Sequence, residues 1–236
     1  MSGAERISRI AAGIDGWLSD AQGRALYEAA AAARGRGAIV EIGSWKGRST
    51  VWLASGARSA RQKVQAIDPH VGSREDPGER TLDAFRENLE RAGVASAVEP
   101  LVMTSAEAAR TLQGPVELLF VDGDHSPEGA RSDADLWLHR VVEGGTVMFH
   151  DVATSGYAGP RRVFQQRICR SAGFHRVRRV GSMAIAERTR SRSTFEAVRA
   201  GVFDARLYFY DVEGAIKRIL RRVRRVRFDT APPSAT

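Results

Sequence analysis

The sequence predicts a single α/β domain built on a doubly wound, mostly parallel sheet of seven strands, followed by a basic C-terminal helix. Short aliphatic runs that end in polar residues alternate with longer amphipathic stretches, a pattern typical of right-handed βαβ crossovers. The last two apolar runs have no helix between them, so they predict an antiparallel hairpin that closes the sheet.

Five apolar runs precede this hairpin. Four of them predict buried strands at 37–43, 64–68, 116–122 and 144–151. Residues 97–102 predict a weaker strand at an edge of the sheet, because Pro100 has no N–H for a central ladder. Helices are expected at 20–34, 49–58, 78–93, 105–112 and 127–142, with the Glu143-Gly144-Gly145 turn ending the last one.

The end of the chain divides into a hairpin and a tail. The hairpin is predicted at 174–188, with Gly181-Ser182 as its two-residue turn. We therefore expect one domain at 1–188, and a polar linker, a basic amphipathic helix and a disordered end within 189–236.

Length and composition indicate a globular protein. A chain of 236 residues suffices for one large domain. The single cysteine, Cys169, excludes an intrachain disulfide framework and fits a reducing compartment. No apolar run approaches the roughly 20 residues that a membrane helix needs, and the N-terminus lacks a signal-peptide core. A cytoplasmic protein is expected.

The net charge of +8 comes almost entirely from one segment. Residues 217–227 hold seven basic side chains and no acidic one, and the rest of the chain has a net charge of +1. This distribution argues against a basic face across the whole domain, so no nucleic-acid partner is expected.

A glycine turn follows the first predicted strand, in the segment VEIGSWKGRST at 40–50. Gly43 and Gly47 would let the backbone turn sharply and approach a ligand closely. Ser49 and Thr50 can cap the helix that follows. The spacing matches neither a P-loop nor a dinucleotide fingerprint. A tight loop with a capping serine is the plain alternative.

Two acidic residues lie at the ends of the first two strands. Glu41, just before the glycine turn, would oppose a phosphate and suits a cationic ligand. Asp68 ends the second strand, where an acidic residue commonly binds ribose hydroxyls. An aspartate before a proline also initiates turns, so Asp68 alone does not decide the ligand.

Titratable residues follow two further strands. Asp122, Asp124 and His125 come directly after the run VELLFV, and Asp151 ends the run GGTVMFHD. In open α/β sheets ligands bind at the carboxyl ends of the strands. The sequence therefore predicts that these side chains share one cleft.

Three motifs in this order resemble the class I S-adenosylmethionine-dependent methyltransferases, a family with a Rossmann-like fold. The segments EIGSWKGRST, FVDGDHSPEG and GGTVMFHDV are similar to the small bacterial O-methyltransferase group, which includes macrolide-sugar and mycobacterial polysaccharide methyltransferases. The resemblance covers residues 20–188 and implies S-adenosylmethionine as the cofactor. It implies cofactor contacts at Glu41, Gly43, Ser44, Trp45, Gly47, Ser49, Asp68, Ser105, Ala106 and Asp122.

The same resemblance implies a metal site and a catalytic base. Asp122, His150 and Asp151 match the positions that bind Mg²⁺ in metal-dependent O-methyltransferases. A bound cation lowers the pKa of an acceptor hydroxyl and orients it. Either His125 or His150 is expected to take the proton, because a neutral imidazole is a suitable base near pH 7.

The expected function is Mg²⁺-dependent O-methylation of a sugar or saccharide-containing acceptor, either a small molecule or an oligosaccharide. Two alternatives stay open: methylation of another small hydroxylated metabolite, such as an antibiotic or a phenol, or a non-catalytic module that only binds the cofactor.

The basic tail has its own pattern. Apolar residues at 216, 219, 220, 223 and 226 form one helical stripe among arginines. The stripe can pack on the domain or on a second subunit, lie on an anionic membrane surface, or contact an acidic partner or nucleic acid. The aromatic segment FDARLYFYD before it favours packing, so a homodimer is expected.

Overall fold

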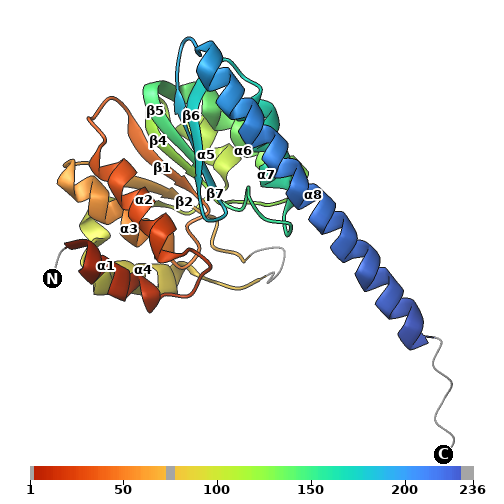
Figure 1. The fold of residues 1–236 in the computed structure, drawn as a ribbon. Coiled ribbons are helices and arrows are strands. Elements are labelled where there is room, and N and C mark those ends of the chain that lie inside the picture. Colours follow the sequence, from red (N-terminus) through yellow and green to blue (C-terminus); the bar gives the residue numbers. More distant parts are fainter. Residues whose placement is uncertain (1–2, 73–77, 230–236) are drawn as a thin grey trace, which may run out of the picture.

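The computed structural model describes residues 3–72 and 78–229, and the predicted disordered end lies outside the described residues. A seven-stranded sheet forms the centre of the molecule, in the order β3-β2-β1-β4-β5-β7-β6 (Figure 1). Its strands are β1 (Ala38–Ile42), β2 (Val64–Ile67), β3 (Val98–Leu101), β4 (Val116–Val121), β5 (Val141–Phe149), β6 (Phe174–Val180) and β7 (Met183–Arg188).

The pairing of the strands confirms the predicted fold class. Strands β1 to β5 pair in parallel, whereas β7 is antiparallel to both β5 and β6. β3 lies at an edge, as Pro100 predicted. β1 pairs with β2 on one side and β4 on the other, so the switch in strand order falls beside the ends of β1 and β4.

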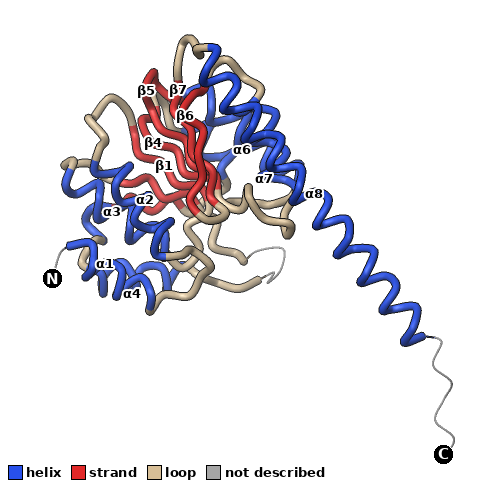
Figure 2. Tube along the Cα trace, in the orientation of Figure 1, coloured by secondary structure: helices blue, strands red, loops and turns tan. Residues whose placement is uncertain are grey.

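Helices cover both faces of the sheet (Figure 2). β1 divides its side chains accordingly, because Ile39 joins one core and Val40 and Ile42 join the other. The first core includes residues of α1 (Gly3–Ala12), α2 (Asp20–Ala31), α3 (Arg48–Ser59), α4 (Leu82–Ala92) and η1 (Ala95–Ala97). The second includes residues of α5 (Ser105–Thr111), α6 (Pro127–Trp137), η2 (Leu138–Arg140), α7 (Ala158–Phe164), η3 (Gln165–Cys169) and α8 (Thr194–Asp229).

The fifth strand begins earlier than predicted. β5 starts at Val141, and the Glu143-Gly144-Gly145 turn lies within it as an irregularity instead of ending a helix. The guanidinium of Arg36 donates to the carbonyl oxygens of Glu143 and Gly144, which fixes this turn against the sheet. Sequence periodicity could not reveal that contact, because it joins positions far apart in the chain.

The C-terminal helix is much longer than the stripe from Ile216 indicated. α8 has 36 residues and begins at Thr194. Ala200 and Leu207 are buried in the core, while the distal half of the helix projects away from the domain (Figure 1). No helix within the described residues is long and apolar enough to cross a membrane.

Candidate functional site

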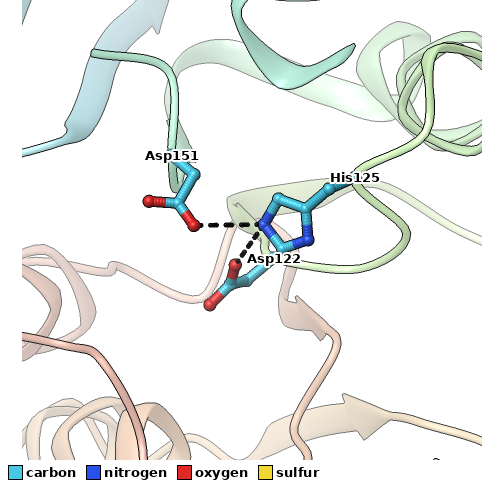
Figure 3. A group of neighbouring side chains, drawn as sticks. All are labelled: Asp122, His125 and Asp151. Carbon is cyan, nitrogen blue, oxygen red and sulfur yellow. Dashed lines mark ion pairs between the residues drawn. The ribbon is translucent and has the colours of Figure 1, made fainter. Parts of the chain in front are cut away.

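Two carboxylates meet at the ends of neighbouring strands. Asp122 follows β4 and Asp151 follows β5, and the parallel pairing of these strands brings the two residues to the same edge. His125 Nε2 lies 3.4 Å from Asp122 Oδ1 and 3.3 Å from Asp151 Oδ2 (Figure 3). Three of the four side chains predicted to share one cleft thus lie close together.

The turn after β4 sets the position of His125. Ser126 caps α6 by accepting from the Gly129 N–H, and Asp124 accepts hydrogen bonds from the backbone and the hydroxyl of Ser126. Both carboxylate oxygens of Asp124 are thus occupied within the turn. The ring of Tyr157 lies 4.4 Å from the His125 ring, measured between centroids, and flanks the imidazole.

A second histidine, His150, lies beside the same two carboxylates and directly precedes Asp151 in the chain. His150 Nδ1 lies 3.3 Å from Asp122 Oδ1 and 3.4 Å from Asp151 Oδ2. The side chain of His150 is 4% exposed, compared with 24% for His125. The ring of His125 is therefore the more exposed of the two, although its Nε2 is buried between the carboxylates.

Gln22 determines which nitrogen of His150 carries the proton. Gln22 Oε1 accepts from the backbone N–H and the hydroxyl of Ser19 in a capping box, so the amide nitrogen must face the other way. Gln22 Nε2 lies 2.9 Å from Ser182 Oγ and 3.2 Å from His150 Nε2. Because an amide nitrogen only donates, His150 Nε2 accepts, and the neutral ring carries its proton on Nδ1.

Opposed charges shift the pKa values of this cluster. Burial lowers the pKa of His125, but Asp122 and Asp151 outweigh it and raise this pKa to about 9. The same carboxylates raise the pKa of His150 against the effect of burial. Burial alone would raise the pKa of Asp151, but its contacts with His125 and His150 hold that pKa below the usual range.

The backbone at Asp151 is also unusual. Its φ of 52° lies in the left-handed region, which residues other than glycine seldom adopt. Strained backbone of this kind persists where the surrounding structure fixes it, and it is common at functional sites. Here it turns the Asp151 carboxylate back toward Asp122.

The donor set fits a hard divalent cation. Asp122, His125 and Asp151 each offer a ligand atom, and these atoms lie within 4.8 Å of one another. His125 Nε2 is buried and lacks a hydrogen bond of normal geometry among the described residues. Two carboxylates are ligands that Mg²⁺ prefers.

The glycine turn lies next to this cluster. Contacts within the protein explain why glycine occupies positions 43 and 47. A Cβ on Gly43 would lie 2.1 Å from the carbonyl oxygen of Asp122, so only glycine lets the two turns pack. Gly47 has a φ of 86° and begins α3, and a Cβ there would press on the Phe85 ring. Both positions therefore require glycine for packing alone.

Glu41 and the predicted helix-capping residues form a buried cluster under the turn. Ser49 Oγ and Thr50 Oγ1 each donate to a different carboxylate oxygen of Glu41, at 2.6 Å. The prediction that Ser49 and Thr50 cap α3 is wrong, because Gly47 occupies the cap and both hydroxyls point inward. Burial raises the pKa of Glu41 to about 7, although these hydroxyls oppose the rise.

Asp68 ties the second strand end to the glycine turn. Its two oxygens accept from the backbone N–H groups of Trp45 and His70, at 2.8 and 2.7 Å. The Trp45 ring stacks on Trp17 at a centroid distance of 5.2 Å and donates to Glu79. Each carboxylate oxygen of Asp68 keeps a further lone pair for a ligand.

The comparisons with known proteins agree with this geometry. Residues 40–152 match a family described as a methyltransferase domain. The chain is 32% identical over 156 residues to a catechol O-methyltransferase of Mycobacterium tuberculosis, a match that covers 66% of this chain and 62% of that relative. Residues 40–152 thus match a methyltransferase domain, and the chain resembles the class I S-adenosylmethionine-dependent methyltransferases in sequence and fold.

Solved structures show the same architecture. Cofactor-bound Rv0187 from MTB is 27% identical, with a TM-score of 0.59 over 80% of this chain and 88% of that chain. An O-methyltransferase from Bacillus cereus in complex with SAH is 22% identical, with a TM-score of 0.59 over 79% of this chain and 90% of that one. The second likeness concerns the fold alone.

Residues predicted to contact the cofactor lie at the edge formed by the ends of β1, β2 and β4. Ser44 is buried, and its hydroxyl lies beside the Glu41 carboxylate. Ser105, the first residue of α5, donates to the buried Asp133, and Ala106 follows it on the same helix. The hydroxyl of Ser105 is thus occupied, and its cofactor contact stays a prediction.

Proposed function

We propose that this chain is an S-adenosylmethionine-dependent O-methyltransferase that uses Mg²⁺ and a small hydroxylated acceptor. One observation carries the proposal: the carboxylates of Asp122 and Asp151 approach the same nitrogen of His125, at 3.4 and 3.3 Å. Two carboxylates so close together need a positive charge between them. A divalent cation meets that need and leaves coordination sites for an acceptor hydroxyl.

The reaction requires few groups from the protein. S-adenosylmethionine supplies a methyl group on a positive sulfur, and Mg²⁺ when bound lowers the pKa of the acceptor hydroxyl. In the proposed step the acceptor oxygen forms a bond to the methyl carbon while the sulfur–methyl bond breaks. In the proposed arrangement Asp122 and Asp151 would hold the cation, and His125 Nε2, left uncoordinated, would take the hydroxyl proton.

We assign the two histidines different roles. His125 is the proposed base, because it is the more exposed and lies on the turn that faces the strand ends. His150 is proposed as a hydrogen-bond donor to Asp122 and Asp151, because Gln22 directs the Nδ1 proton of the neutral ring toward them. In this assignment His150 positions the metal ligands and is neither a ligand nor the base.

The acceptor is proposed to carry adjacent hydroxyl groups. The motif resemblance favours a sugar or saccharide, and the relative described as a catechol O-methyltransferase favours an aromatic diol. Both kinds of acceptor present two neighbouring oxygens, which can occupy two coordination sites of one cation. A saccharide is our first candidate and a catechol is the second.

A methyl-transfer assay tests the proposal. Purified full-length protein is incubated with labelled S-adenosylmethionine and a panel of sugars, oligosaccharides and catechols, with EDTA and after Mg²⁺ is restored. We expect transfer that stops with EDTA and returns with Mg²⁺. Turnover that is unaffected by EDTA would remove the metal from the proposal. Tight S-adenosylhomocysteine binding without turnover on any acceptor would favour a non-catalytic module.

A further inference from the structure

One face of α8 carries an apolar stripe. Its members are three, four or seven residues apart in the sequence. These spacings place the side chains on one side of a helix. The stripe consists of Phe195, Val198, Val202, Phe209, Val212 and Ile216, which are between 48% and 74% exposed. Soluble domains rarely leave so much contiguous apolar surface uncovered, so the stripe has a partner.

The stripe is not the face that holds α8 on the domain. Ala200 and Leu207, which are buried in the core, lie on a different side of the helix. The acidic residues of this docked half are used there: Asp204 accepts from Arg170 at 3.0 Å, and Asp211 pairs with Arg161. The domain therefore neutralises these acidic groups and leaves the stripe facing outward.

A basic groove borders the stripe. β6 is the last strand of the sheet, and a groove of about 560 Å³ separates its side chains from α8. Val198, Val202 and Phe209 of the stripe form part of its wall, and Arg178, Arg179 and Arg206 form another part. We call this feature the basic groove. Apolar and cationic groups thus face the same space.

The part of α8 beyond the groove is also both apolar and basic. Ile219 and Leu220 are exposed and continue the apolar surface. Residues 217–227 hold seven basic side chains and no acidic one. The partner of this surface must therefore be negatively charged as well as apolar.

A second copy of the chain does not meet this requirement. Pairing two α8 helices in parallel would place the two basic segments 217–227 side by side. Pairing them antiparallel would place each segment near the other copy's basic groove, where Arg178, Arg179 and Arg206 lie. Either arrangement opposes like charges in an apolar interface, which costs free energy.

We propose that the apolar stripe and the basic groove dock the protein on the surface of an anionic lipid bilayer. Phe209, Val212 and Ile216 enter the boundary between headgroups and acyl chains, and the basic residues meet the anionic headgroups. α8 lies along the surface, in agreement with the finding that no described helix is suited to cross a membrane.

Vesicle flotation with the full-length protein tests the proposal. Vesicles of phosphatidylcholine alone are compared with vesicles that also contain phosphatidylserine. We expect flotation only with phosphatidylserine, and its loss as salt is raised, because salt screens the headgroup charge. The variant V212S/I216S removes two apolar contacts and should lower the affinity at least about tenfold. The variant R178Q/R206Q should lower it by about fivefold for each charge removed.

The matched control is K63Q/R91Q, which removes two exposed basic side chains outside the stripe and the groove. It should float like the unchanged protein, and circular dichroism checks that all variants fold. Failure of the unchanged protein to bind either kind of vesicle would overturn the proposal, as would equal binding to both. A stable dimer in analytical ultracentrifugation that V212S/I216S dissociates would assign the stripe to a second copy instead.

Discussion

Asp151 Oδ2 lies 3.3 Å from Nε2 of His125, although one residue follows β5 and the other follows β4. The contact exists because parallel pairing brings the ends of these strands together and because the left-handed backbone at Asp151 turns its carboxylate inward. It makes the charge of the carboxylates and the protonation of the imidazole depend on each other.

The variant D151N tests the metal site. The amide keeps the size of the side chain but loses the charge that a cation needs, so methyl transfer should fall at least about 100-fold. Affinity for S-adenosylhomocysteine, measured by calorimetry, should stay within about threefold, because Asp151 is not among the predicted cofactor contacts. D135N, which alters an exposed carboxylate on α6 paired with Arg167, is the control. Full activity of D151N would refute the assignment.

Mg²⁺ should lower the pKa of His125. In the metal-free protein this pKa is about 9, so the ring is protonated at pH 7 and cannot act as a base. A cation that neutralises Asp122 and Asp151 removes the cause of the rise. An NMR titration of the ring protons, with and without Mg²⁺, measures the shift. If Mg²⁺ left the pKa of His125 unchanged, the cation would not bind between Asp122 and Asp151 as proposed.

The same pKa implies a pH dependence of stability without metal. His125 has a higher pKa folded than unfolded, where 6.5 is the ordinary value. Its contribution to the free energy of unfolding is therefore complete below pH 6.5 and is lost as the pH rises through 9. Chemical denaturation of H125N and of the unchanged protein in EDTA should give curves that converge toward pH 9 and separate below pH 6.5.

Glu41 should produce the same downward trend with rising pH, over a lower pH range. Its pKa rises from 4.5 to about 7 on folding, so the folded state holds this proton more tightly. Its contribution to stability is greatest below pH 4.5 and falls by roughly 3 kcal/mol as the pH passes 7. E41Q should flatten this part of the profile, measured by urea denaturation at pH 5 and pH 8. An identical slope in E41Q would show that Glu41 titrates normally.

Gln22 should control the tautomer of His150. Q22E keeps an oxygen for the capping box with Ser19 but replaces the amide donor opposite His150 Nε2 by an acceptor. We expect the neutral Nδ1–H form in the unchanged protein with Mg²⁺ at pH 8, and the doubly protonated ring in Q22E, as reported by ¹⁵N chemical shifts of the imidazole. An Nε2–H tautomer in the unchanged protein would contradict the assignment.

The sequence indicated the architecture because its local patterns agree with the sheet. Each aliphatic run became a strand, and Gly181-Ser182 formed the hairpin turn between Val180 and Met183. Asp122, His125 and Asp151 could be grouped in advance, because residues that end parallel strands must share one edge.

Contacts between distant positions could not be predicted in this way. Nothing in the spacing of Gln22 and His150 links them, and their contact became visible only in the structure. The hydroxyls of Ser49 and Thr50 suit a helix cap as well as a buried carboxylate, and burial of Glu41 decided between these roles. The first half of α8 was missed because its docked acidic residues interrupt the basic pattern.

Gly43 has no room for a side chain against the carbonyl oxygen of Asp122. The glycine turn, which is predicted to bind the nucleoside, therefore packs directly on the strand end that is proposed to bind the cation. A displacement of one of these segments must move the other. Thermodynamic reciprocity then requires that any gain in cation affinity caused by the nucleoside be matched by an equal gain in the reverse direction. Cooperative binding of the two ligands, in whichever order they arrive, would follow from the absence of a Cβ at Gly43.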